Sequence, residues 1–122
     1  MPTIYTLAKH IPFDYDGSVE RGVTLRFPAG DTRVSAALFR ALLRHFHGEV
    51  EGGFNFIAPP PGGLGEWVQD NSALTPKHAS HIAAILAHEG YIGYYMRGKA
   101  VWLQFPLSGR EEATSCLEPL RS

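Results

Sequence analysis

Residues 74–92 read LTPKHASHIAAILAHEGYI, and they carry the clearest structural pattern in the chain. Thr75 is a good helix cap, and Pro76 suits the first helical position because the amide it lacks has no partner there in any helix. Gly90 is the residue expected just after the helix, since glycine readily takes the backbone conformation that ends one. Between them, apolar side chains recur at i, i+3, i+4 and i+7 spacing, at Ala79, Ile82, Ala83 and Leu86. The stretch therefore predicts a capped amphipathic helix.

The segments on either side of this helix have patterns of their own. Residues 91–96 and 100–105 are rich in Tyr, Val and Trp, which predicts two β-strands. Arg97-Gly98-Lys99 joins them and predicts the tip of a hairpin. Upstream, residues 64–71 predict a short helix with Trp67 and Val68 turned inward. The order is then short helix, turn, capped helix and hairpin.

A second amphipathic helix is predicted further upstream. Asp31 is a candidate N-cap, the run from Val34 to Phe46 contains no Gly or Pro, and Gly48 is a plausible stop. Arginines and one histidine gather on the polar face of this helix, at Arg33, Arg40, Arg44 and His47.

The first thirty residues predict a small β element. Val23–Phe27 alternates apolar and polar side chains, and Ile4–Leu7 is a shorter strand-like piece. The residues between them, 12–17, are turn-rich. We expect a small antiparallel element or a single edge strand here.

Residues 52–65 form an unusual segment with five glycines and three consecutive prolines. Its apolar side chains are Phe54, Phe56 and Ile57. One interpretation is a connector whose aromatic side chains enter the core. The other is an arm that binds a partner or a second copy of the chain, because Phe beside rigid Pro loses little entropy on binding.

The composition leaves room for one ordinary domain. The chain has 122 residues, 44% of them hydrophobic, and its single cysteine, Cys116, cannot form an internal disulfide. No run approaches the roughly 20 apolar residues of a membrane span, and the amino terminus lacks a basic-then-apolar signal pattern. We expect a soluble, cytoplasmic protein that makes no membrane contact.

The net charge of −1 conceals a segregation of charge along the chain. Residues 48–71 carry four acidic side chains and no Lys or Arg, whereas residues 72–105 carry Lys77, Arg97 and Lys99 against Glu89 alone. The later segment is therefore the one expected to face an anionic partner.

The predicted element order is that of a winged helix-turn-helix. Residues 74–92 resemble the recognition-helix segment of bacterial winged-helix regulators of the MarR and ArsR type, in which a Leu-x-x-x-Gly-Leu-Val leader enters the wing. Leu86–Ile92 resembles that leader, and Arg97-Gly98-Lys99 resembles a basic wing tip. The resemblance covers about residues 64–105 and implies a winged helix-turn-helix there. Together with the upstream helix, we expect an α+β winged-helix domain over residues 31–105 that includes the 52–65 insertion, with a β extension at 1–30 and an acidic tail at 106–122. The expected function is binding of duplex DNA, either sequence-specific or architectural, by a small transcriptional regulator, with a homodimer as the expected assembly.

Physical chemistry assigns roles to the polar residues of this frame. A helix in the major groove offers polar side chains from its first two turns to base edges, and here these are Lys77, His78, Ser80 and His81. Arg97 and Lys99 would hold the DNA backbone from the wing, and Arg40 and Arg44 would assist from the first helix.

Parts of the same sequence also fit other functions. A protein-interaction module or inhibitor would dock through Phe54–Leu64 and the surface at Tyr91–Tyr95. The sequence shows no recognisable metal-ligand motif in which Asp, Glu or Cys completes the histidine pairs 45/47 and 78/81, so no metal or other cofactor is expected. Ser80 with His81, or Cys116 with a histidine, could in principle form a nucleophile pair. The sequence shows no general base, orienting carboxylate and oxyanion site that would complete either pair, so no enzyme activity is expected.

Overall fold

The computed structural model describes residues 3–54, 60–98 and 100–106. Within these ranges the chain has a mixed α+β fold with three helices and two antiparallel sheets. The helices are α1 (Ala36–His45), α2 (Leu64–Asn71) and α3 (Pro76–His88). The first sheet has the order β1-β2-β3-β4, with β1 at Thr3–Tyr5, β2 at Pro12–Ser18, β3 at Gly22–Phe27 and β4 at Gly30–Val34. The second has the order β5-β7-β6, with β5 at Gly48–Glu51, β6 at Gly93–Arg97 and β7 at Ala100–Phe105.

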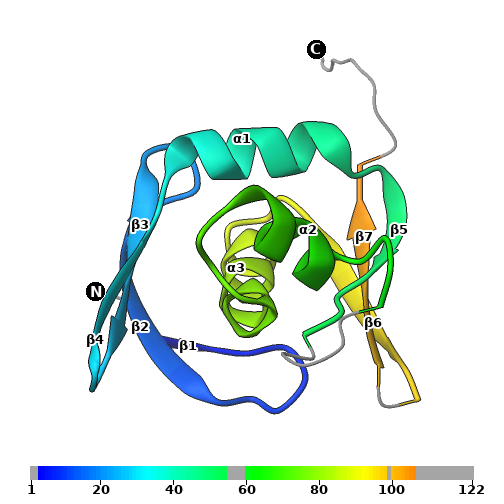
Figure 1. Cartoon of the computed structure of the whole chain (residues 1–122). Helices are drawn as coiled ribbons and strands as arrows, with labels where there is room; N and C mark the ends of the chain where they lie inside the picture. Colours follow the sequence, from blue (N-terminus) through cyan, green and yellow to red (C-terminus); the bar gives the residue numbers. More distant parts are fainter. Residues whose placement is uncertain (1–2, 55–59, 99, 107–122) are drawn as a thin grey trace.

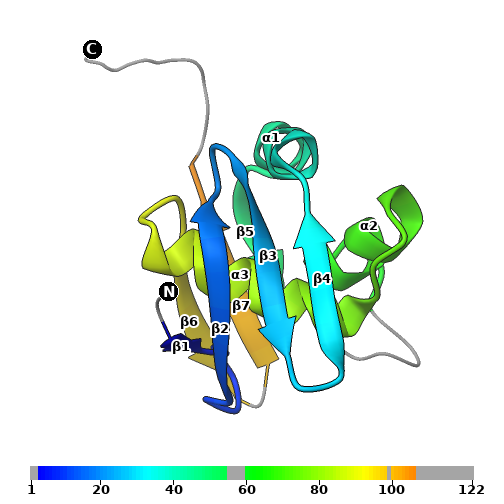
Figure 2. The same ribbon diagram turned by 90° about the vertical axis from the view of Figure 1, so that its left-hand side faces the viewer.

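Helix α3 runs through the middle of the molecule. Figure 1 shows the four-stranded sheet on one side of α3 and the three-stranded sheet on the other, with α1 lying across one end. Figure 2 looks onto the four-stranded sheet, with α3 and the second sheet behind it. One continuous hydrophobic core joins all these layers, and its fully buried members come from both sheets and every helix, among them Leu25, Phe39, Leu42, Leu64, Ile82 and Leu103.

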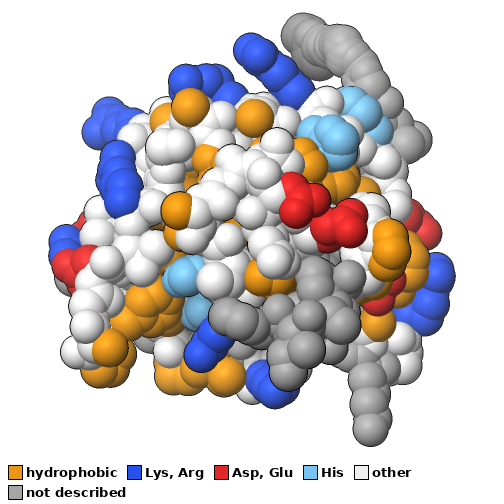
Figure 3. Space-filling view, viewed as in Figure 1, with side chains coloured by type: hydrophobic (Ala, Val, Ile, Leu, Met, Phe, Trp, Pro, Cys, Tyr) orange, Lys and Arg blue, Asp and Glu red, His pale blue; other side chains and the backbone are white. Residues whose placement is uncertain are grey.

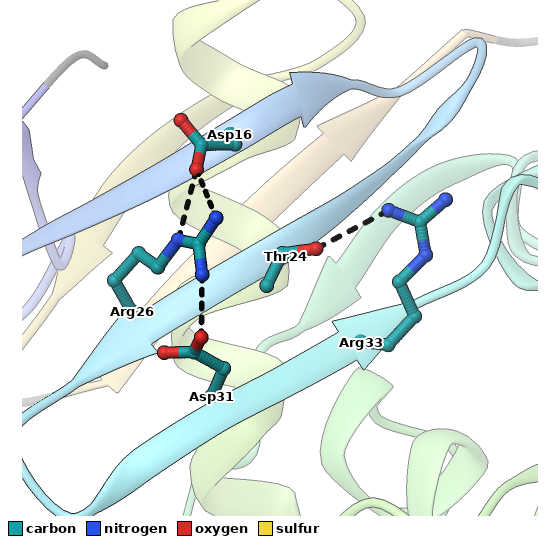
Figure 4. Close-up of polar contacts among 5 residues, drawn as sticks. All are labelled: Asp16, Thr24, Arg26, Asp31 and Arg33. Carbon is teal, nitrogen blue, oxygen red and sulfur yellow. Dashed lines mark hydrogen bonds and ion pairs between the residues drawn. The ribbon is translucent and has the colours of Figure 1, made fainter.

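The amino-terminal sheet is larger than the sequence pattern indicates. Residues 12–17, expected to be turn-rich, lie in β2, where Phe13 and Tyr15 point into the core. Asp31 was expected to cap a helix, but it lies in β4 opposite Arg26 of β3. The Arg26 guanidinium donates to the carboxylates of Asp31 and Asp16, with Nε to Asp16 Oδ2 at 2.8 Å (Figure 4). This cross-strand network stabilises a strand where the helix start was predicted.

The cap of α1 lies four residues later than predicted. Ser35 is the N-cap, and its Oγ accepts a hydrogen bond from the Leu38 amide at 3.1 Å. Because β4 extends to Val34, the first sheet is joined to α1 by this single residue. The four-stranded sheet is thereby fixed at the amino-terminal end of α1.

The carboxyl-terminal half follows the predicted order closely. Helix α2 has the predicted bounds, and α3 begins after Thr75 and is followed by Gly90 at a φ of 85°. Gly98 takes a φ of 63° at the tip of the predicted hairpin. Strand β5 was not predicted, and it pairs with β7 rather than with a sequence neighbour.

Candidate functional site

Helix α3, predicted to enter the DNA major groove, is enclosed on nearly all sides. Ala79 and every residue from His81 to Leu86 are buried. A helix that reads bases needs one face free over about two turns. The sequence contains a signal for this enclosure, because Ser80 and His81 are the only polar residues between positions 79 and 87. A helix that is apolar all round is a buried one.

His81 lies inside the protein instead of on the DNA-facing surface expected for it. Its ring makes edge contacts with Phe13 of β2 and Phe27 of β3, at centroid distances of 4.6 Å and 5.0 Å. Only 7% of its surface is exposed, and this burial lowers the pKa of the imidazole to about 4. At neutral pH His81 is therefore uncharged and covered by the first sheet, so it offers nothing to a phosphate.

The polar side-chain atoms of His78 and Ser80 form hydrogen bonds within the first turns of α3. The Thr75 amide donates to His78 Nδ1 at 3.1 Å, which completes a capping box at the start of α3. Burial, followed by the charge of Lys77, lowers the pKa of His78. Ser80 Oγ donates to the Lys77 carbonyl at 2.7 Å. Of the four side chains expected to read bases, Lys77 is the exposed one.

The β6–β7 hairpin holds Arg97 in contacts of its own. The guanidinium carbon lies 4.4 Å from the centroid of the Trp102 ring, and Nη2 donates to the Tyr95 hydroxyl at 2.8 Å. A carboxylate oxygen of Glu49 lies 3.8 Å from the same nitrogen, so the charge of Arg97 is partly balanced. Lys99 lies outside the described residues. The tip of this hairpin and α1 are at opposite ends of the molecule (Figure 1), so Arg97 does not join the arginines of α1.

Four exposed arginines lie on elements at the other end of the molecule, in the turn before β3, in β4 and in α1. We call this surface the arginine edge, and it consists of Arg21, Arg33, Arg40 and Arg44. The Arg33 guanidinium donates to the Arg21 carbonyl at 3.1 Å and to Thr24 Oγ1 at 3.3 Å, and Figure 4 shows the contact with Thr24. Arg40 and Arg44 follow on the outside of α1, separated by a rise of about 6 Å along its axis.

The charge of the arginine edge is not balanced by neighbouring acids. Within the described ranges, the carboxylates that form ion pairs do so with Arg26 or Arg97 and not with any arginine of the edge. Figure 3 shows Lys and Arg side chains gathered along the edge over α1, whereas Asp and Glu side chains lie away from it. The sequence pattern placed Arg33, Arg40 and Arg44 on one helix face, but Arg33 lies in β4, before the helix begins. Arg21 was missed, because only the folded chain brings its backbone carbonyl to the Arg33 guanidinium.

A groove lies beside the arginine edge, between α1 and the connection from α2 to α3. Its volume is about 470 Å³. Arg33 and Ser35 lie at its border, and its other lining residues are Ala37, Leu38, Ala41, Trp67, Asn71, Ser72, Ala73 and Leu74. The lining is mostly apolar, so this is the described surface where an apolar group can settle next to unbalanced positive charge.

The predicted partner-binding arm is only partly described. Phe54 is half-buried against the core, and Leu64 is fully buried. These two side chains fit a connector that contributes to the core. Phe56 and Ile57 lie outside the described residues. Of the other proposed docking surface, Tyr94 is 44% exposed and Tyr91 is half-buried.

The remaining chemical signals are few. No group of three or more His, Cys, Asp or Glu side chains that would hold a metal occurs among the described residues, and Cys116 lies outside them. His45 stacks on Trp67, and His47 Nδ1 lies 3.3 Å from the Pro106 carbonyl oxygen. In the described part of the chain, no helix has the length and apolar character needed to cross a membrane.

Comparison of the chain with protein-family models, with curated proteins and with solved structures finds no match. The function is therefore inferred from the surfaces described above, of which the arginine edge and its adjoining groove are the most distinctive.

Proposed function

We propose that residues 36–105 form a winged helix and that the chain binds duplex DNA through the arginine edge. The element order α1-β5-α2-α3-β6-β7, with the sheet order β5-β7-β6, supports the winged-helix assignment. In this order α1, α2 and α3 correspond to the helical core of a winged helix, and the β6–β7 hairpin corresponds to its wing. The four-stranded amino-terminal sheet is an addition to that frame, and it covers the third helix.

The observation that carries the DNA-binding proposal is the set of four exposed guanidinium groups without a described carboxylate partner. A guanidinium is planar, always charged and able to donate two parallel hydrogen bonds to a phosphate. The groups project from a paired hairpin and a capped helix, so their backbones are held in place. Rigid positioning lowers the entropy lost when phosphates bind.

Binding through this edge is expected to be largely independent of sequence. Phosphate contacts fix the position of a protein on DNA but carry no base information directly. Base reading would need a free helix face, and α3 is buried from Ala79 to Leu86 apart from the half-buried Ser80. We therefore propose an architectural type of DNA binding. Sequence-specific binding is disfavoured, because α3 has no free face with which to read bases.

Fluorescence anisotropy with a short labelled duplex at low salt tests this proposal. The double variant Arg40→Gln/Arg44→Gln is expected to bind at least about tenfold more weakly, because it removes two phosphate contacts. Arg26→Gln is the matched control, since Arg26 is exposed but bound to Asp16 and Asp31. Its affinity should stay within twofold of the unmodified chain. Equal affinity of the double variant and the unmodified chain would refute the proposal.

A further inference from the structure

The groove beside the arginine edge has the size and lining of a ligand site. Its volume of about 470 Å³ is within the usual range of roughly 300–1,000 Å³ for small-molecule pockets. Two small side chains on α1, Ala37 and Ala41, leave this space open, and Trp67 of α2 supplies an aromatic surface. A flat apolar group therefore suits it better than a polar one.

The aromatic surface of the groove is held in place from behind. His45 stacks on Trp67 at a centroid distance of 5.8 Å and an interplanar angle of 29°, and Phe46 meets the same indole edge-on at 6.0 Å. Neither residue lines the groove. The Asn71 amide group donates to the Trp67 carbonyl at 2.9 Å, which leaves the amide oxygen of Asn71 as an acceptor at the groove.

Positive charge lies directly next to this apolar surface. Arg33 itself lines the groove. Arg40 and Arg44 lie three residues after Ala37 and Ala41, so they share one side of α1 with the groove wall. The ligand that complements this arrangement has a flat aromatic body attached to a chain of negative charges.

Resting on the DNA-binding function proposed above, we propose that the groove takes an unpaired base of a DNA strand whose phosphates lie on the arginine edge. Proteins that bind single strands combine a positively charged track for the backbone with aromatic side chains for the bases. In a duplex the bases are paired and stacked, so only a single strand or an open end reaches the groove. The preferred substrate class is then DNA with unpaired bases.

Quenching of Trp67 fluorescence provides the first test. In a Trp102→Phe background Trp67 is the sole tryptophan, because the chain contains two. Addition of an oligothymidine strand should quench its emission in a saturable way, whereas a duplex of equal length should leave it nearly unchanged. Binding of the strand without quenching would overturn the proposal. Quenching by an acidic amphipathic peptide but not by the strand would also overturn it, in favour of a protein ligand.

A variant that fills the groove provides the second test. Ala41→Leu should weaken binding of the oligothymidine strand by roughly 5- to 150-fold, which corresponds to the stacking of one base, and leave duplex affinity within twofold. Ala29→Leu, in the exposed turn between β3 and β4, is the matched control and should change neither affinity. Thermal melting confirms that both variants fold.

The outcomes separate the two proposals. If Ala41→Leu leaves strand binding unchanged while Arg40→Gln/Arg44→Gln weakens it, the groove assignment fails and the arginine edge stands. If the duplex is not bound at all but the strand still quenches Trp67, the duplex proposal fails and the groove assignment stands.

Discussion

The buried imidazole of His81 makes the folded chain sensitive to mild acid. In the unfolded chain a histidine has a pKa of about 6.5, whereas burial lowers the pKa of His81 in the fold to about 4. Between these two values the unfolded chain binds a proton that the folded chain does not. Lowering the pH from 6.5 towards 4 therefore favours unfolding.

The size of the effect follows from the two pKa values. Between pH 7 and pH 5 the free energy of unfolding should fall by about 2 kcal/mol on account of His81 alone. The lowered pKa of His78 acts in the same direction, so the loss of stability from His78 and His81 together is at least this large. His81→Leu keeps an apolar group between Phe13 and Phe27 and removes the titrating imidazole. The free energy of unfolding of this variant should therefore fall by about 2 kcal/mol less between pH 7 and pH 5 than that of the unmodified chain.

Urea unfolding at pH 7, 6 and 5, followed by tryptophan fluorescence, measures this difference. His88→Leu is the control, because His88 is exposed in the last turn of the same helix. That variant should retain the pH dependence of the unmodified chain. If His81→Leu lost stability with acid as steeply as the unmodified chain, the enclosure of α3 by the first sheet would be refuted.

Two further predictions concern contacts that tie the molecule together. Glu89, just after α3, accepts hydrogen bonds from the Tyr15 hydroxyl at 2.7 Å and from the Val19 amide at 3.0 Å, so Glu89→Ala should lower the free energy of unfolding by about 1–3 kcal/mol in urea titrations. An unchanged unfolding midpoint would contradict this link between sheet and helix. A Cβ at Gly65 would lie 1.7 Å from a backbone oxygen, whereas one at Gly93 would meet only the end of the flexible Gln104 side chain at 3.0 Å. Gly65→Ala should therefore lower the melting temperature by several degrees or more, and Gly93→Ala should lower it far less. Similar melting temperatures would contradict the close approach of α2 to the Gly53 carbonyl.

Local sequence signals were sufficient where the structure is decided locally. Thr75, Pro76 and Gly90 predicted both ends of α3, and Gly98 predicted the hairpin tip, because caps and turns depend on the residues that form them. Asp31 failed as a cap for a long-range reason. It satisfies the same capping rule as Ser35, but pairing with Arg26 across the β3–β4 hairpin places it in a strand.

The candidate site could be predicted only in part, because its surfaces are created by packing between distant segments. Strand β2 depends on partners on both sides, and its inward residues Phe13 and Tyr15 are recognisable as core only once that sheet is formed. The burial of His81 depends in turn on that sheet. The arginines of α1 were predicted from helical spacing, but the groove beside them required the placement of Trp67 against α1.

The salt dependence of duplex binding counts the phosphate contacts that the arginine edge makes with DNA. Each phosphate contact contributes about −0.9 to the slope of log K against log salt concentration, so four contacts at the arginine edge predict a slope of about −3.6. Removing two of them in Arg40→Gln/Arg44→Gln predicts a slope of about −1.8. A slope near zero for the unmodified chain, or an identical slope for the double variant, would contradict the assignment of the arginine edge as the DNA-binding surface.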